Sequence, residues 1–305
     1  MAVVDDEKST KSGMYADFSL LFVALIWGGG FVVIKDALQN ITPFYMMSLR
    51  FVLAFLIMAA VFWKSTRKIK KSDITAGIII GIFLFAAYGS QTVGLQYTTA
   101  GKQAFLTGAN VVMVPFLYWI ISKKRPDLYA IAGAFMCLFG IGLLTLQNGL
   151  AVSKGDTLTL ISAFFFACHI VSVGYFAKKS DPVVLSILQT GFAAIIFVVC
   201  AVLFEQPLRH INSGATAAIA YQVLLSTLAA VLIQNIAQKY TTSTHAAIIL
   251  CLESVFGSLL AVLFLGDIFS GKMIIGCVLI FAAIITTETR FSFLKKPESV
   301  QKKVR

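Results

Sequence analysis

Ten long apolar segments follow one another along this sequence, and they restrict its fold more than any other feature. A helix needs ~20 mostly apolar residues to cross a bilayer. Only helices and closed barrels satisfy their backbone groups in lipid, and these segments are too continuous for the alternating strands of a barrel. We therefore expect an all-α integral membrane protein with ten transmembrane helices. The predicted spans are 17–35, 43–63, 74–95, 101–122, 128–147, 157–177, 183–204, 215–237, 244–265 and 272–289.

The composition of the chain agrees with this class of protein. Apolar residues make up 58% of the sequence and charged residues 13%, and the mean hydropathy is +0.87. Soluble domains are usually about 45–50% apolar and about 25% charged, so a water-soluble enzyme, a disordered protein and a fibrous repeat are excluded. The five cysteines lie in apolar segments without a CxxC motif or a His/Cys cluster. We expect packed thiols, and neither a disulfide framework nor a metal site.

The basic residues are distributed unevenly between the predicted loops. Nineteen of the 25 Lys and Arg residues fall on one side of the membrane, five fall on the other, and Arg50 lies within a span. Because basic residues concentrate in cytoplasmic loops, we expect cytoplasmic tails at 1–16 and 290–305 and a location in the cytoplasmic membrane. The net charge of +11 is then an orientation signal, so we expect contact with membrane lipids and none with nucleic acid. The first apolar segment lacks a clear cleavage site and is interpreted as a membrane helix.

The two halves of the chain resemble each other, which predicts one repeat at 17–147 and a second at 155–289. Five helices are an odd number, so the second repeat would have inverted topology. Inverted repeats are typical of secondary transporters, with a site near the midplane, although a duplication can also simply build a stable bundle. The matching pairs are Asp17 with Asp156 and Pro43 with Pro182 at an offset of 139, and Gln91 with Gln234 and Tyr97-Thr98-Thr99 with Tyr240-Thr241-Thr242 at an offset of 143.

Several short motifs resemble the EamA domain of the drug/metabolite transporter superfamily. In the first half they are Trp27-Gly28-Gly29-Gly30-Phe31 with Lys35, Pro43 and Leu49-Arg50-Phe51, then Thr98-Thr99-Ala100-Gly101-Lys102 with Phe105-Leu106-Thr107 and Val114-Pro115. The second half contributes Leu252-Glu253-Ser254 and Leu263-Phe264-Leu265-Gly266-Asp267, where Ser254 and Asp267 replace the usual Pro and Glu. The resemblance covers about 17–146 and 155–288. It implies a ten-helix carrier with cytoplasmic termini that exports amino acids, metabolites or drugs. Its cavity would be lined mainly by the third, fourth, eighth and ninth helices.

Two charged residues within the spans are the first candidates for substrate binding. Polar groups at lipid depth usually face a cavity or a partner, because their exposure to acyl chains is costly. Glu253, near the middle of its span, would bind a substrate ammonium group or exchange a proton; alternatively it pairs with a basic residue that holds helices together. Arg50 would contact a substrate carboxylate, or hold helix ends through carbonyl groups and lipid headgroups.

Two basic residues at helix starts are further candidates. Lys102 follows the capping residues Thr98 and Thr99, where the helix dipole disfavours a cation. We therefore expect a negative partner for Lys102, which is either a substrate carboxylate or a side-chain carboxylate. His245 occupies the matching position in the second half. His169 lies in the sixth span. It would either take part in proton coupling or pack between helices through a hydrogen bond.

The remaining candidates would line the cavity with amide and aromatic groups, or else join helices by hydrogen bonds and packing. Asn110 is the counterpart of Glu253, and Phe166 is the counterpart of Trp27, which stands beside three glycines. The amides are Gln91, Asn110, Gln234 and Asn235, and the aromatic residues are Trp27, Tyr88, Phe166 and Tyr221.

The sequence contains no Walker A pattern, no HExxH motif and no Ser/His/Asp arrangement with a catalytic context, so we expect no enzyme, no metal and no cofactor. The favoured function is a secondary transporter that exports amino acids or similar small metabolites by alternating access, with a proton as the candidate coupling ion. A multidrug exporter of hydrophobic cations is the first alternative, and Lys102→Ala should leave such transport largely intact. An intramembrane lipid-modifying enzyme and a passive pore are the others; counterflow distinguishes a carrier from a pore.

Overall fold

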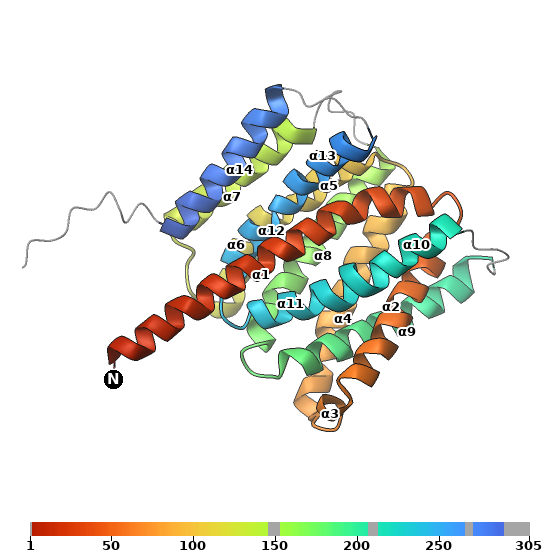
Figure 1. The fold of residues 1–305 in the computed structure, drawn as a ribbon, viewed down its shortest axis with the longest axis horizontal. Helices are drawn as coiled ribbons and strands as arrows, with labels where there is room; N and C mark the ends of the chain where they lie inside the picture. The colour runs from red at the N-terminus through yellow and green to blue at the C-terminus, as the bar shows by residue number, and fades with distance from the viewer. Residues whose placement is uncertain (1, 146–152, 207–212, 266–270, 290–305) are drawn as a thin grey trace, which may run out of the picture.

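The computed structural model describes residues 2–145, 153–206, 213–265 and 271–289, and this part of the chain is helical and contains no strand (Figure 1). The prediction of an all-α fold is therefore confirmed for the described residues. The helices are α1 (Ala2–Ala37), α2 (Pro43–Val61), α3 (Trp63–Thr66), α4 (Lys71–Leu95), α5 (Ala100–Gly108), α6 (Asn110–Ser122), α7 (Leu128–Thr145), α8 (Lys154–Phe176), α9 (Pro182–Phe204), α10 (Ser213–Tyr221), the π-helix η1 (Gln222–Ala229), α11 (Ala230–Ala237), α12 (Ser243–Leu250), α13 (Leu252–Leu265) and α14 (Gly271–Thr289).

Within the described residues, each predicted span lies in one helix or in a run of consecutive helices. Six helical segments of the described chain are long and apolar enough to cross a membrane, and four shorter apolar helices accompany them. The chain is thus a multi-pass membrane protein. The six segments are Gly13–Lys35, Pro43–Val61, Lys71–Leu95, Lys154–Phe176, Pro182–Phe204 and Gly214–Ala237, and the shorter helices are Leu106–Ser122, Leu128–Leu143, Ser243–Gly257 and Ile274–Thr287.

Proline and capping residues set several helix starts. Pro43 and Pro182 begin α2 and α9, where the missing N–H of proline has no cost because the first turn leaves it unpaired in any case. At α8 the Ser153 N–H donates to Asp156 Oδ2 over 2.7 Å, and the Asp156 N–H donates to Ser153 Oγ over 3.2 Å. This reciprocal pair satisfies two backbone donors that would otherwise be unpaired at the helix start.

Four of the predicted spans are not continuous α-helices. The span 43–63 is interrupted at Phe62, between α2 and α3. The span 101–122 is interrupted at Ala109, between α5 and α6, and the span 244–265 is interrupted at Cys251, between α12 and α13. These breaks lie at nearly equivalent places in the two halves, given the offset of 143. The span 215–237 passes through the π-helix η1 at its centre. Discontinuous helices in membrane transporters expose backbone groups where they line a cavity.

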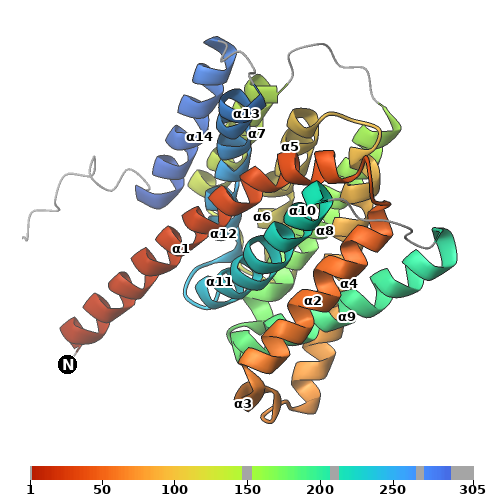
Figure 2. The same ribbon diagram turned by 45° about the vertical axis from the view of Figure 1, so that its right-hand side comes forward.

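The helices pack as two groups around α1, which runs diagonally across the molecule (Figure 1). The helices α7 and α14 lie side by side at one edge, and α2, α4 and α9 lie together on the other side of α1 in both views (Figures 1 and 2). One cluster of buried apolar side chains joins the first part of α1 to α6, α8, α12 and α13. A second cluster joins the end of α1 to α2, α4, α9 and α10.

Candidate functional site

A cavity lies in the interior of the bundle, and residues of both apolar clusters line it. The breaks between α5 and α6 and between α12 and α13 both reach this cavity, through Gly108 and Asn110 on one side and Cys251 and Glu253 on the other. Nine of the thirteen predicted site residues line it: Trp27, Arg50, Tyr88, Gln91, Asn110, Phe166, His169, Gln234 and Glu253.

Arg50 provides the positive charge of the cavity and is fully buried, with 0% of its surface exposed. Its Nε donates to Thr227 Oγ1 over 2.6 Å, and its Nη2 donates to Ser226 Oγ over 3.1 Å. The guanidinium also stacks on the Tyr88 ring, 4.2 Å from the ring centroid, which is a cation–π contact. Within the described part of the chain Nη1 has no hydrogen-bond partner, and no carboxylate pairs with Arg50. One nitrogen of a buried cation is therefore left for a ligand.

Glu253 provides the carboxyl group of the cavity and is partly exposed to it. No donor or basic group among the described residues lies within hydrogen-bonding or ion-pair distance of its carboxylate. Its position depends on Gly28, because a Cβ at that glycine would come within 2.7 Å of the Glu253 carbonyl oxygen and 2.8 Å of the Gly257 nitrogen. Only glycine thus lets α1 approach α13 closely beside the carboxylate.

The amide and imidazole groups of the cavity differ in whether a protein group satisfies them. Gln91 Nε2 donates to Thr107 Oγ1 over 3.1 Å, and His169 Nε2 lies 2.8 Å from Gln189 Oε1. Gln234, the counterpart of Gln91, is 1% exposed, and neither of its amide atoms has a partner among the described residues. Because buried polar groups normally find partners, Gln234 is well placed to bind a ligand or water.

Aromatic rings form the apolar wall of the cavity. The Phe166 ring meets the Tyr88 ring edge-on, with 5.0 Å between the ring centroids. Trp27 donates its Nε1–H to the Ser226 carbonyl over 2.9 Å, so its indole is fixed in place. Phe31, one turn further along α1, also lines the cavity. These rings offer a large apolar surface close to the two charged groups.

Three predicted site residues whose side chains are described lie outside the cavity lining, and a fourth, Lys102, is outside the described side chains. Tyr221 donates its hydroxyl to the Ile26 carbonyl over 2.5 Å, and Asn235 Nδ2 donates to Ser186 Oγ over 2.8 Å; both therefore join helices. Lys102 is in the first turn of α5, and its side chain is outside the part of the structure that is described. His245 lies away from the cavity and contacts Asp17.

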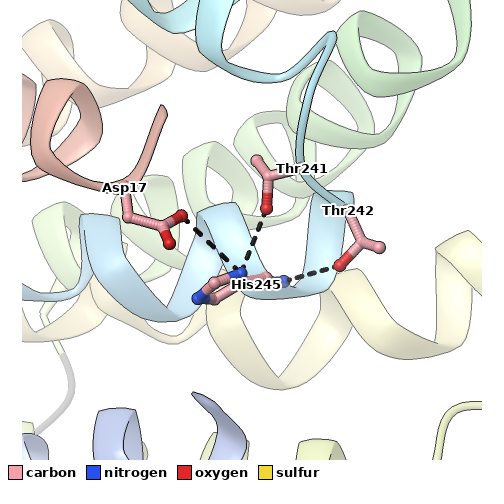
Figure 3. A network of polar contacts seen from close by, with 4 residues as sticks. All are labelled: Asp17, Thr241, Thr242 and His245. Atoms are coloured by element: carbon pink, nitrogen blue, oxygen red, sulfur yellow. Dashed lines mark hydrogen bonds and ion pairs between the residues drawn. The ribbon is translucent and has the colours of Figure 1, made fainter. Parts of the chain in front are cut away.

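The contact of His245 belongs to a polar network near the start of the membrane part of α1 (Figure 3). His245 Nδ1 lies 3.8 Å from the Asp17 carboxylate and 3.1 Å from Thr241 Oγ1, and the His245 N–H donates to Thr242 Oγ1 over 3.2 Å. Asp17 belongs to the first half of the chain and the other three residues to the second half. The network thus ties the two halves together at this end of the bundle.

Four polar or aromatic lining residues were absent from the prediction: Phe31, Thr107, Ser226 and Ser254. Ser254 donates its hydroxyl to the Ala104 carbonyl over 3.1 Å and so joins α13 to α5. Hydroxyl groups are common in membrane helices and carry no charge, so their sequence positions gave no signal. No group of three or more His, Cys, Asp or Glu side chains that could hold a metal occurs within the described chain.

Comparison with known proteins gives consistent matches over most of the chain. The profile of the EamA-like transporter family matches residues 14–146 and again 153–289. The chain is 34% identical to an "Uncharacterized transporter" of Archaeoglobus fulgidus, over 91% of this chain and 87% of that protein. It is 28% identical to a protein of Escherichia coli (strain K12) named "Probable amino-acid metabolite efflux pump", over 90% and 94% of the two chains. A solved crystal structure shares the fold, with a TM-score of 0.77, 18% identity and coverage of 93% of this chain and 99% of that one.

Proposed function

Because the chain belongs to the EamA-like transporter family, we propose that it is a secondary transporter that exports amino acids or similar small metabolites across the cytoplasmic membrane. The relative named as an amino-acid metabolite efflux pump supports this substrate class and this direction. The observation that carries the proposal is the pair of opposite charges in one cavity. Arg50 and Glu253 both line it, and neither pairs with a group of opposite charge in the described chain.

An amino acid is complementary to this arrangement of charges. Its carboxylate would meet Nη1 of Arg50, its ammonium group would meet Glu253, and its side chain would lie against Trp27, Tyr88 and Phe166. Burying a charge without a partner costs several kcal/mol, so a zwitterion that satisfies both charges at once is favoured. A hydrophobic cation would leave the buried Arg50 unpaired, and this disfavours the multidrug alternative.

The proposed mechanism is alternating access by two inverted repeats of five helices, 17–147 and 155–289, with both termini in the cytoplasm. The ten helical segments, the breaks at Ala109 and Cys251 and the matching profile in each half support this arrangement. Two similar halves that face opposite ways can pack in two mirror-related arrangements, one open to each side. A proton remains the proposed coupling ion, with Glu253 and His169 as the cavity groups that can carry it.

The test is counterflow of labelled amino acids into liposomes that contain the purified protein. We expect internal unlabelled substrate to accelerate uptake, and Glu253→Gln to lower the affinity for the amino acid by about tenfold or more, because it removes a charge-assisted contact. Asp127→Asn is the control, since that carboxylate lies at the start of α7 and outside the cavity lining. Chemical turnover of a lipid without flux, or flux without counterflow, would contradict the proposal.

A further inference from the structure

The π-helix η1 alters the hydrogen bonding of one carbonyl group next to the cavity. The N–H of Ala230 donates to the carbonyls of Leu225 and Thr227, whereas in an α-helix it would donate to Ser226. The Ser226 carbonyl accepts from two cavity side chains, Trp27 Nε1 over 2.9 Å and Arg50 Nη2 over 3.5 Å. Single π-helical turns often occur at functional sites, and here the turn faces the proposed substrate.

The side chains of the same turn hold Nε and Nη2 of the Arg50 guanidinium. Thr227 Oγ1 accepts from Nε over 2.6 Å, and Ser226 Oγ accepts from Nη2 over 3.1 Å. The guanidinium is planar, so fixing Nε and Nη2 also fixes the direction of Nη1. Ser226 and Thr227 are 3% and 0% exposed, so both residues that hold the guanidinium are buried. A hydroxyl or carbonyl oxygen orients a cation without cancelling its charge, as a carboxylate would.

We propose that Ser226 and Thr227 are positioning residues, which hold Arg50 so that its Nη1 meets the carboxylate of the substrate. This inference rests on the proposed function, because it assumes a substrate with a carboxylate. A binding group that is fixed in advance loses less conformational entropy when its ligand arrives. The π-helical turn is then the part of α10–η1–α11 that sets the affinity for the carboxylate of the substrate.

The test compares amino acids with the amines that lack their carboxylate. The probes are leucine with 3-methylbutylamine and phenylalanine with phenethylamine, and their affinities are measured on the purified full chain. Thr227→Val removes the contact with Nε at nearly constant volume, and Thr227→Ser restores it. Thr190→Val is the matched control, because Thr190 is equally buried, its hydroxyl has no partner among the described residues, and it lies outside the cavity lining.

We expect Thr227→Val to weaken amino-acid binding by about tenfold, the usual effect of losing a hydrogen bond to a charged group, and to leave amine binding unchanged. Thr227→Ser and Thr190→Val should bind both probes like the wild type. In an Arg50→Met background, Thr227→Val should cause no further loss. If Thr227→Val fails to fold, Ser226→Ala, which removes one contact with Nη2, should show the same selective loss at smaller size.

Equal weakening of amino-acid and amine binding by Thr227→Val would overturn the positioning role, since it would indicate a general disturbance of the cavity. Unchanged binding of both probes would overturn it as well. Both of these results leave the proposed function intact. A wild-type protein that binds the amines but no amino acid would overturn the proposed substrate together with this inference.

Discussion

The Thr98 hydroxyl donates a hydrogen bond to the Asp156 carboxylate over 2.9 Å, and this contact joins the two halves of the chain. It lies near the end of α1, because Lys35 Nζ donates to the Thr98 carbonyl over 2.9 Å. Asp17 is eighteen residues earlier on α1, which corresponds to about 27 Å along the helix axis. The Thr98–Asp156 contact and the network of Figure 3 therefore lie at opposite ends of the bundle. Their residues correspond by the two repeat offsets, Asp17 with Asp156 and Thr98 with Thr241.

Alternating access requires these two contacts to separate in turn. We predict that a short bis-methanethiosulfonate cross-linker, which forms a disulfide with each of the cysteines introduced by Asp17→Cys and His245→Cys, abolishes transport, and that reduction of these disulfides restores it. The same treatment of Thr98→Cys with Asp156→Cys should also stop transport, because the opposite end is then locked. The single-cysteine variants control for modification of the native thiols. Unimpaired flux through either cross-linked protein would show that its end does not open.

Gly28 should tolerate no side chain. A methyl group at this position would overlap the Glu253 carbonyl and the Gly257 nitrogen, so Gly28→Ala must push α1 away from α13. We expect a loss of about 1–3 kcal/mol of stability, as for other overpacked sites, and a large fall in transport. Gly13→Ala is the matched control on the same helix, because nothing lies within 4 Å of its added Cβ. Thermal unfolding in detergent and counterflow measure the two effects, and a Gly28→Ala protein as stable as Gly13→Ala would contradict the packing argument.

Arg50 should contribute to binding at the expense of stability. It is buried without a carboxylate partner among the described residues, and enclosing a charge without an opposite charge costs several kcal/mol, a cost that an apolar side chain avoids. We predict that Arg50→Met leaves the melting temperature of the ligand-free protein unchanged or raised, while amino-acid binding falls by tenfold or more. A clear drop in the melting temperature without ligand would indicate that Arg50 is structural.

Glu205 should stabilise the junction between α9 and α2. Its carboxylate accepts from Thr42 Oγ1 over 2.6 Å, from the Phe44 N–H over 2.9 Å and from the Tyr45 N–H over 2.8 Å. These donors lie at the start of α2, where the helix dipole favours a negative charge. We expect Glu205→Ala to lower stability by about 1–2 kcal/mol, and Glu205→Gln to lower it less. Thermal unfolding would detect the difference, and equal stability of all three proteins would exclude the capping role.

Much of this architecture follows from hydropathy, because lipid demands long apolar helices and the sequence shows them directly. Within the described residues, the predicted spans all lie in helical segments. The breaks at Ala109 and Cys251 and the π-helix η1 were not predicted, since they depend on packing between helices that are distant in the sequence. No glycine or proline stands at the break at Cys251. There the N–H of Cys251 donates to the carbonyls of both Ala247 and Ile248.

The cavity could be predicted in part, and its charged residues most reliably. Arg50 and Glu253 had to face the interior because lipid excludes them. The amides were harder to place, since the register of each helix decides which of two neighbours faces the cavity. Gln234 faces it, whereas the adjacent Asn235 contacts Ser186 on α9. Hydropathy does not distinguish these two positions.

Nη1 of Arg50, which has no hydrogen-bond partner among the described residues, has a consequence for the transporter when no substrate is bound. To return without cargo, the protein would have to enclose that charge in a dehydrated compartment with no counter-charge among the described residues, whereas a proton can neutralise Glu253. A loaded protein avoids this barrier, because the cargo brings a carboxylate with it. One-for-one exchange should therefore run faster than net efflux, and the two rates would diverge most where the trans compartment holds no substrate.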